Sequence, residues 1–449
     1  MSALDRWFDL PARGTNPARE LRGAVATFLT MAYILFVNPQ ILGHATGMSP
    51  EQQRSLLAAT ALAAGVCSIL MGVVANFPLA LASGMGLNAI VAFTVAPKLG
   101  SWQAAMGLVV LDGVVTFFLV LAGLREAVLN AIPRDLRLAI GAGIGVFIAF
   151  IGLVNAKLVI VPAATLIGLQ ADPLAALPPM TAGKLSSPET LVALMGVVIT
   201  AVLVARRVTG ALVIGILATT FVGYFWGLTK FPHAWDRPRF DVLFKADVQA
   251  ALAWRYAPLL FALIMVDFFD TLGTASAVAE QAGLVDERGR IPKARRVLMI
   301  DSLSAAIGGW FGASSVTSYV ESAAGVAEGA RTGLHSVIVG ALFLLAVFLS
   351  PLAGMVPAAA TAPALILVGF LMIAQIGRID FGDFDTSIPA FVTLLTIPLT
   401  FSIAHGIGYG FILFVLIKVL TGRWRDAHPL MYVAAAAFAV NFFLESRPG

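Results

Sequence analysis

NFPLALASGMGLNAIVAF at residues 76–93 and GASSVTSYVESAAGVAEG at residues 312–329 are two apolar stretches that both begin in an extended form. The first alternates as PLALA, and the second begins with SSVTSYV, which is rich in β-favouring residues. Each then continues with small residues that suit a helix. Without its extended start, neither is long enough to cross a bilayer as one helix. We therefore expect each segment to combine a short strand with a half-helix.

The composition of the 449-residue chain places these segments in a membrane protein. Hydrophobic residues make up 59% of the chain and charged residues 12%, against about 25% charged in soluble domains. The sequence therefore predicts an all-α polytopic membrane protein without a large soluble domain. The basic residues behind its net charge of +4 fall in loops, so we expect a lipid bilayer as its surroundings and no nucleic-acid partner.

Apolar runs of membrane-spanning length recur along the whole chain. A further run at 430–444 could span, lie flat or pack outside the bundle. We predict about fourteen principal segments, at 24–42, 56–76, 82–96, 104–123, 136–154, 189–205, 210–228, 257–280, 296–312, 318–330, 334–350, 361–376, 387–403 and 405–421.

The charge of the loops predicts the orientation of the chain. With the N-terminus inside, the cytoplasmic loops carry 18 lysines and arginines and the outer loops carry 9. Five of those nine lie in the long 229–256 loop, where the positive-inside rule is weak. The bias predicts a cytoplasmic N-terminus.

The two halves of the chain resemble each other. NAIPRDLRLAIGAGIGVFIAFIGLV at 130–154 is similar to GMVPAAATAPALILVGFLMIAQIGRI at 354–379, with Pro133 opposite Pro357. Because seven segments is an odd number, the two repeats must have opposite orientations. Interrupted segments at matching places of inverted repeats point to the substrate site of a secondary transporter. We divide the chain into a first repeat (1–228), an outer loop (229–256), a second repeat (257–421) and an apolar tail (422–449).

The stretch LIMVDFFDTLGTASAVAEQAG at 263–283 places two carboxylates in an apolar run. A carboxylate at the bilayer centre costs about 2.5–3.5 kcal/mol on insertion scales. In a helix, Asp267, Asp270, Thr271 and Thr274 form one polar stripe, which must face protein or a watery cavity. We interpret the stripe as part of a binding site, with a purely structural hydrogen-bond network as the alternative.

Glu321 lies where the extended part of the tenth segment meets its helix. The start of a helix presents free N–H groups and partial positive charge. Glu321 therefore either caps its own helix or combines with these groups into a surface of acceptors and donors. The third segment offers similar donors around Ser83 and Gly84, and Asn88 adds an amide. A flat ligand edged with N–H, C=O and ring nitrogen suits such a surface.

Other polar and aromatic residues give weaker signals. Phe268 and Tyr319 could stack on the faces of a flat ligand, with core packing as the alternative. Asn38 either bonds backbone freed by Pro39 or edges the site. Asp301 follows the basic run RGRIPKARR, and we interpret it as lying near the cytoplasmic rim. No Walker motif, HExxH motif or paired Cys/His cluster occurs, so we expect neither a metal site nor an enzyme.

Five stretches of the chain match the motifs of a known family: ATFLTMAYILFVNPQIL (26–42), FPLALASGMGLNAIVAF (77–93), DFFDTLGT (267–274), AEQAGLVDERGRIPKARRVLMIDSLSAAIGG (279–309) and SSVTSYVESAAGVAEGARTGLHS (314–336). On these motifs, and over nearly its whole length, the chain resembles the purine permeases for adenine, guanine and hypoxanthine. These form the azaguanine-resistance branch of the xanthine/uracil permease superfamily.

The resemblance implies about fourteen transmembrane segments in two inverted seven-segment repeats. A core domain would hold segments 1–4 and 8–11, and a gate domain would hold segments 5–7 and 12–14. Substrate would bind between the short strands of segments 3 and 10, beside segment 8. The family couples uptake to protons, and no other cofactor is expected. A homodimer through the gate domain is expected by analogy.

The same resemblance assigns the segment-8 acid to Asp270, which Gly273 follows in the family's acid-x-x-Gly pattern, and the segment-10 acid to Glu321. Two departures separate the chain from the xanthine and uracil branches. Those branches have glutamate in place of Asp270, and they have Asn in place of Ser322 with glycine one residue earlier than Gly325. We expect the shorter acid to leave room for a purine. The predicted substrate-binding residues are Asp270, Glu321, Ser83, Gly84, Asn88, Tyr319 and Phe268, and the supporting or coupling residues are Asp267, Thr271, Thr274, Ser322 and Asn38.

Together with the polar residues of the interrupted segments, the resemblance implies a proton-coupled importer of purine nucleobases in the inner membrane of a bacterium. An anion exchanger of the same fold is one alternative, which two acids facing the site disfavour. A passive channel is another, which accumulation against a gradient would exclude. Two acids that face one cavity titrate as a coupled pair, and of the two we prefer Glu321 as the proton carrier.

Overall fold

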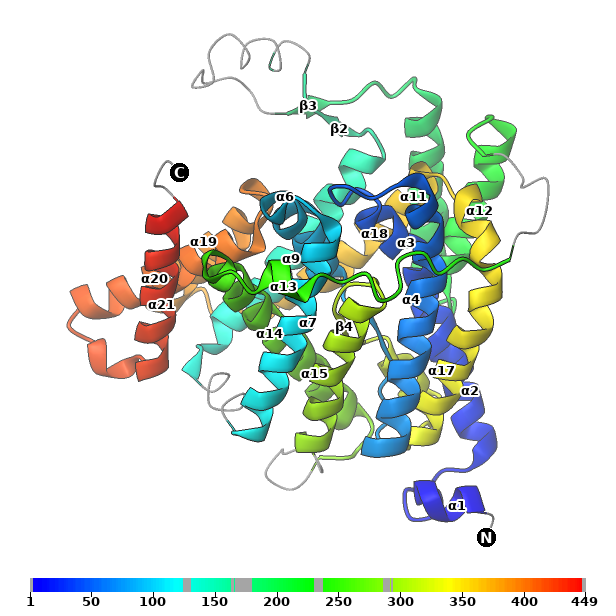
Figure 1. Cartoon of the computed structure of the whole chain (residues 1–449), viewed down its shortest axis with the longest axis horizontal. Coiled ribbons are helices and arrows are strands. Elements are labelled where there is room, and N and C mark those ends of the chain that lie inside the picture. Colours follow the sequence, from blue (N-terminus) through cyan, green and yellow to red (C-terminus); the bar gives the residue numbers. More distant parts are fainter. Residues whose placement is uncertain are drawn as a thin grey trace.

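The computed structural model describes residues 3–123, 131–162, 165, 180–229, 237–285, 291 and 294–445. Helices account for most of these residues (Figure 1). In the first half the principal helices are α2 (Pro17–Met31), α3 (Ile34–Leu42), α4 (Pro50–Leu70), α5 (Met85–Ile90), α7 (Trp102–Leu121), α9 (Arg134–Asn155), α11 (Pro188–Ala205) and α12 (Ala211–Phe225). In the second half they are α14 (Ala257–Gln281), α15 (Ala294–Trp310), α16 (Ser322–Ala327), α17 (Gly333–Ala346), α18 (Ala358–Ile373), α19 (Phe384–Leu399), α20 (Ile403–Leu420) and α21 (Pro429–Glu445).

Most helices begin within a few residues of the predicted segments, and local capping explains where. The side chains of Ser49, Ser101 and Ser187 each accept a hydrogen bond from a backbone N–H of the helix that follows. Such caps satisfy N–H groups that have no partner inside the helix. The predicted tail at 430–444 is a helix, α21.

The first predicted segment, 24–42, ends where the helical stretch Pro17–Leu42 ends but starts seven residues too late. The helix starts at Pro17, because Asn16 caps it by accepting a hydrogen bond from Arg19 N and proline is well suited to the first helical position. The first turn of this helix contains charged residues, so its hydropathy is too low to mark it as part of an apolar segment. The segment is also two helices, α2 and α3, with a break at residues 32–33.

Within the described part of the chain, eight helical stretches are long and apolar enough to cross a membrane. Shorter apolar helices include Met85–Leu99, Ala211–Phe225, Phe384–Leu399 and Pro429–Phe443. The eight are Pro17–Leu42, Pro50–Ala75, Trp102–Leu121, Arg134–Asn155, Pro188–Ala205, Gly333–Leu352, Ala358–Arg378 and Ile403–Leu420. The protein is therefore a multi-pass helical membrane protein.

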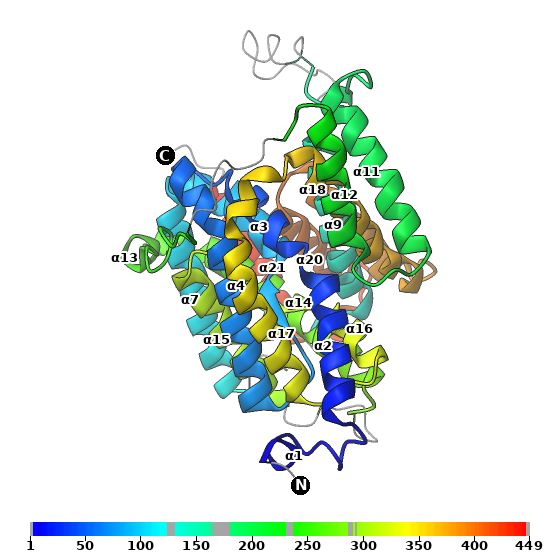
Figure 2. The same ribbon diagram turned by 90° about the vertical axis from the view of Figure 1, so that its right-hand side faces the viewer.

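The helices pack as two groups that lie side by side (Figure 2). Helices α2, α3, α4, α7, α14, α15, α16 and α17 contact mainly one another, and we call them the first group. Helices α9, α11, α12, α18, α19 and α20 form the second group, with α21 against α20. Contacts within each group exceed those between them, which are made chiefly by α3 with α18 and by α2 with α12. The short helix α1 (Ala3–Phe8) and the N-terminus lie at one end of the molecule, at the bottom of both figures.

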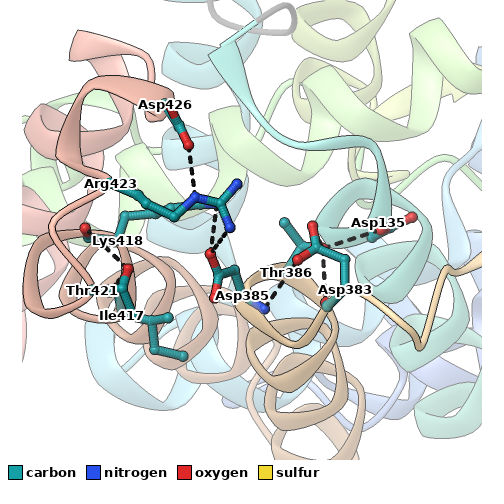
Figure 3. Close-up of polar contacts among 9 residues, drawn as sticks. All are labelled: Asp135, Asp383, Asp385, Thr386, Ile417, Lys418, Thr421, Arg423 and Asp426. Carbon is teal, nitrogen blue, oxygen red and sulfur yellow. Dashed lines mark hydrogen bonds and ion pairs between the residues drawn. The ribbon is translucent and has the colours of Figure 1, made fainter.

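A polar cluster joins the start of α19 to the end of α20 in the second group (Figure 3). Asp385 accepts hydrogen bonds from Lys418 Nζ at 3.1 Å and from Arg423 at 2.5 Å, and Arg423 also donates to Asp426 at 2.9 Å. Lys418 lies in the last turn of α20, where the helix dipole favours a cation. Its side chain is only 5% exposed, so its charge depends on Asp385 for a partner.

Asp385→Ala is expected to destabilise this end of the protein strongly. The substitution leaves the Lys418 ammonium buried without its carboxylate, which costs about 3 kcal/mol or more. The matched control is Asp426→Ala in the same cluster, where both partners are about half exposed and the loss is expected to be about 1 kcal/mol or less. The midpoint of thermal unfolding in detergent measures both. Equal shifts for the two variants would contradict the assignment of the Lys418–Asp385 pair.

Candidate functional site

Two short strands lie among α4, α14 and α15. β1 (Leu81–Ser83) pairs antiparallel with β4 (Val316–Ser318), and all six residues are buried. A backbone hydrogen bond from Gly84 N to Ser315 O, 2.9 Å long, extends the ladder. The predicted short strand at the start of each interrupted segment is thus confirmed. The half-helices α5 and α16 begin just after the strands, and because the strands are antiparallel the two half-helices start at opposite ends of the strand pair.

Three of the predicted site hydroxyls bind the scaffold around the strands. Ser83 Oγ donates to Ala313 O at 2.6 Å, and the Tyr319 hydroxyl donates to Ser83 O at 2.6 Å. Ser322 Oγ accepts a hydrogen bond from Ala80 N at 2.9 Å. Each contact crosses between the third and tenth segments. These side chains therefore hold the two interrupted segments together, and their direct contact with a ligand stays a prediction.

Asp301, which the sequence suggested lies near the cytoplasmic rim, is joined in the structure to the strand pair and to α14. It is fully buried, and it lies about 10 Å along α15 from the first residue of that helix. Its Oδ1 accepts hydrogen bonds from Ser318 N at 3.1 Å and Ser318 Oγ at 2.8 Å, and its Oδ2 accepts one from Thr271 Oγ1 at 2.6 Å. One carboxylate on α15 therefore fixes the end of β4 to α14.

Glu321 lies at the N-cap position of α16, but its side chain makes no capping hydrogen bond. This excludes the alternative that it merely caps its own helix. Instead its Oε1 accepts a hydrogen bond from the Tyr33 hydroxyl at 2.7 Å. We did not predict Tyr33 from the sequence. The available signal was weak: a single tyrosine in an otherwise apolar run, which is more often a core residue.

Two asparagines differ in how their amides are satisfied. Asn38 Nδ2 donates to Thr60 Oγ1 at 2.8 Å and to Ala313 O at 3.2 Å, so it holds the strand segment and does not bond the backbone that Pro39 frees. Asn88 is fully buried on α5, and among the described residues neither atom of its side-chain amide has a hydrogen-bond partner. Buried polar groups are normally paired. An amide with open donors and an open acceptor is therefore a candidate ligand contact.

The predicted polar stripe lies on α14. Asp267 and Thr271 are fully buried and Thr274 is 9% exposed, so these three residues face protein. The side chain of Asp270 lies outside the described part of the structure. Phe268 packs in an apolar cluster with Ile264 and Met265, against side chains of α7, and stacking of its ring on a ligand stays a prediction.

The parts that come together have the chemistry of a recognition site for a small polar molecule. Two half-helices begin at the strand pair, and α5 has no side-chain cap because Gly84 precedes it. Its first N–H groups are donors without a capping side chain. The Glu321 carboxylate is half-buried and supplies an acceptor, and the Asn88 amide supplies both kinds of group. Donors and acceptors thus flank the strand pair, from one interrupted segment at each of its ends.

The xanthine/uracil permease family model, described as "Permease family", matches residues 19–409. This chain belongs to that family. The permease is therefore a transporter and not an enzyme. Its sequence is 42% identical to the "Adenine permease AdeQ" of Escherichia coli over 444 residues, which cover 98% of this chain and 96% of AdeQ. It is 41% identical to the "Guanine/hypoxanthine permease PbuG" of Bacillus subtilis over 457 residues, which cover 98% of this chain and 99% of PbuG.

A solved structure shares the fold of this permease. The transmembrane domain of the cyanobacterial bicarbonate transporter BicA superposes with a TM-score of 0.64, covering 87% of this chain and 96% of that domain. The two sequences are 18% identical over this superposition, so the likeness concerns the fold alone.

Proposed function

We propose that this permease imports purine nucleobases, with adenine, guanine and hypoxanthine as the substrates to test. The observation that carries the proposal is the identity of 41–42% over 98% of the chain with relatives named as adenine and guanine/hypoxanthine permeases. A purine carries N–H and C=O groups and ring nitrogens around a flat ring. The half-helix N–H groups, the Asn88 amide and the Glu321 carboxylate offer the complementary donors and acceptors.

We propose the same site residues that the sequence suggested. Asp270 and Glu321 would accept purine N–H bonds, and Asn88 would bond an edge of the ring. Ser83, Gly84, Tyr319 and Phe268 would line the site, although the hydroxyls of Ser83 and Tyr319 bind the scaffold. The supporting residues would be Asp267, Thr271, Thr274, Ser322 and Asn38, and no metal ion is required.

The proposed topology has fourteen spans in two inverted repeats, 1–228 and 257–421, joined by an outer loop at 229–256 and followed by the tail at 422–449. The division of the helices into two contact groups supports a core domain and a gate domain. We place the N-terminus in the cytoplasm on the loop-charge bias and the protein in the inner membrane. A homodimer through the gate domain is part of the same proposal.

Protons are the proposed coupling ion. An acid that alternates between two sides of the membrane can take up a proton on one side and release it on the other, and Glu321 lies at the junction of strand and half-helix. The test is uptake of labelled purines at several external pH values with and without an uncoupler. Saturable uptake that rises at low external pH and collapses with uncoupler is expected. Uptake that depends on sodium and not on pH would refute proton coupling.

The same assay separates the alternatives. The shared fold with a bicarbonate transporter makes an anion the main competitor, so bicarbonate and sulfate are offered as competing solutes. We expect no competition, because two acids at the site repel an anion. A passive channel could not accumulate purine above the external concentration.

Asp270→Asn is expected to weaken purine binding at least about five-fold. The substitution keeps the shape but replaces an acceptor oxygen by a donor, leaving a buried N–H of the purine unsatisfied at a cost of about 1–3 kcal/mol. Asp267→Asn is the matched control on the same helix, and it is expected to weaken binding less. Equilibrium binding of labelled purine to both purified variants is the measurement. If Asp270→Asn kept purine binding and Asp267→Asn lost it, Asp267 would be the substrate-binding residue and Asp270 the supporting one.

A further inference from the structure

Tyr33 occupies the break between α2 and α3, and its side chain is fully buried. A buried phenol normally finds a hydrogen-bond partner for its hydroxyl. Here the hydroxyl donates to Glu321 Oε1 at 2.7 Å, a contact between the first and the tenth segments. A hydrogen bond to a carboxylate is stronger than one between neutral groups. The proposed substrate acid therefore has a fixed donor outside its own segment.

The position of that donor is set by tight packing of α2 against α16 (Figure 2). Gly23 and Gly325 form the contact: a Cβ atom on Gly325 would overlap Thr27 Oγ1 and come within 2.5 Å of Gly23 O. One turn further along α2, Thr27 Oγ1 lies 2.8 Å from His335 Nε2 of α17. Helices that approach this closely cannot slide past each other without a clash. Tyr33 and Glu321 are thus held in register.

The base of α2 is fixed to the same part of the second half. The two carboxylate oxygens of Glu20, which is fully buried, accept hydrogen bonds from Arg331 N at 2.9 Å and His335 N at 3.1 Å. Both donors follow α16 in the chain. The α2–α16 pair is therefore anchored at its base as well as along its length, and the phenol is a rigid reference point for the carboxylate.

A glutamate side chain has three rotatable bonds, and α16 offers it no capping bond that would orient it. A donor fixed on Oε1 restricts this freedom and leaves Oε2 as the oxygen that can accept from a ligand. Orienting a binding group before the ligand arrives lowers the entropic cost of binding. Side chains that bind a substrate need hydrogen bonds from neighbouring residues to stay in the orientation that the substrate requires.

We propose that Tyr33 is a positioning residue for purine binding, which orients the Glu321 carboxylate so that its second oxygen meets the substrate. The inference rests on the proposed function and adds to it a residue of the first segment. Tyr33 acts through Glu321, so its contribution must depend on that carboxylate.

The test is a double-mutant cycle on equilibrium binding of labelled adenine, guanine and hypoxanthine to purified protein. Tyr33→Phe keeps the ring and removes only the hydroxyl. It is expected to weaken the affinity about ten-fold in the wild-type background, as loss of a bond to a charged group would. In the Glu321→Gln background the partner of the phenol is neutral. There, Tyr33→Phe is expected to weaken the purine affinity about three-fold or less. Where that background binds too weakly to measure, Glu321→Asp replaces it, because the shorter acid ends out of reach of the phenol.

The matched control is Tyr432→Phe, which removes a tyrosine hydroxyl that donates to Trp424 O at 2.6 Å on the C-terminal helix. We expect wild-type affinity for this variant. Wild-type affinity of Tyr33→Phe, or an equal loss in both Glu321 backgrounds, would overturn the inference and leave the proposed function standing. Absence of purine binding by the wild-type permease would instead refute the proposed function. A fall in thermal stability of Tyr33→Phe without any change in affinity would assign Tyr33 to packing alone.

Discussion

Glu321→Gln is expected to abolish accumulation of purine driven by a pH gradient, while exchange of purine across the membrane continues. Glutamine has the shape of the protonated acid but cannot release a proton, so the variant is fixed in one of the two charge states that coupling needs. Facing acids titrate as a pair, and we propose Glu321 as the carrier because it lies where β4 gives way to α16.

Counterflow and gradient-driven uptake in the same proteoliposomes separate binding from coupling. The Glu321→Gln variant should retain counterflow of labelled purine within about ten-fold of wild type, because one hydrogen-bond partner is weakened and not removed. Full proton-driven accumulation by the variant would exclude Glu321 as the coupling residue. If the variant lost counterflow together with gradient-driven accumulation, Glu321 would be required for substrate binding. Asp270 would then be the candidate proton carrier.

Asp301→Ala is expected to destabilise the permease and to remove purine binding. Among the residues that the structure describes, Ser318 donates two hydrogen bonds to the Asp301 carboxylate and Thr271 donates one, and all three residues are essentially buried. Alanine leaves these donors unsatisfied, and each buried unsatisfied group costs about 1–3 kcal/mol. The end of β4 would then be free to move relative to α14, and the site residues on either side would lose their relative positions.

Ser304→Ala is the matched control for Asp301→Ala. It lies one turn further along the same helix and is also buried, and its hydroxyl, the group that alanine removes, donates to the backbone of its own helix at Ile300 O. The expected loss is about 1 kcal/mol or less, with wild-type purine affinity. Thermal unfolding and equilibrium binding are measured for both variants. Wild-type affinity of a folded Asp301→Ala variant would show that β4 needs no anchor on α14.

The local pattern of the sequence was sufficient for the elements of the fold. Runs of apolar residues gave the helices to within a few residues, because burial in lipid requires apolar side chains over a fixed length. The strands at 81–83 and 316–318 followed from short extended starts before small-residue helices. Composition and motifs also led to the transporter class, and the acids in segments 8 and 10 marked the candidate site because a buried charge in a membrane is costly.

Only the tertiary structure decided which of these elements meet. Nothing in the local sequence pairs Tyr33 with Glu321, or Asp385 with Lys418, since each contact joins segments far apart in the chain. Asp301 shows the physical reason most clearly. Its place after a basic run gave no sign that it would bind the end of β4 and Thr271 of α14, because these partners lie in other segments of the chain. Periodicity reports which face of a helix is polar, and the partner of that face is set by packing between distant segments.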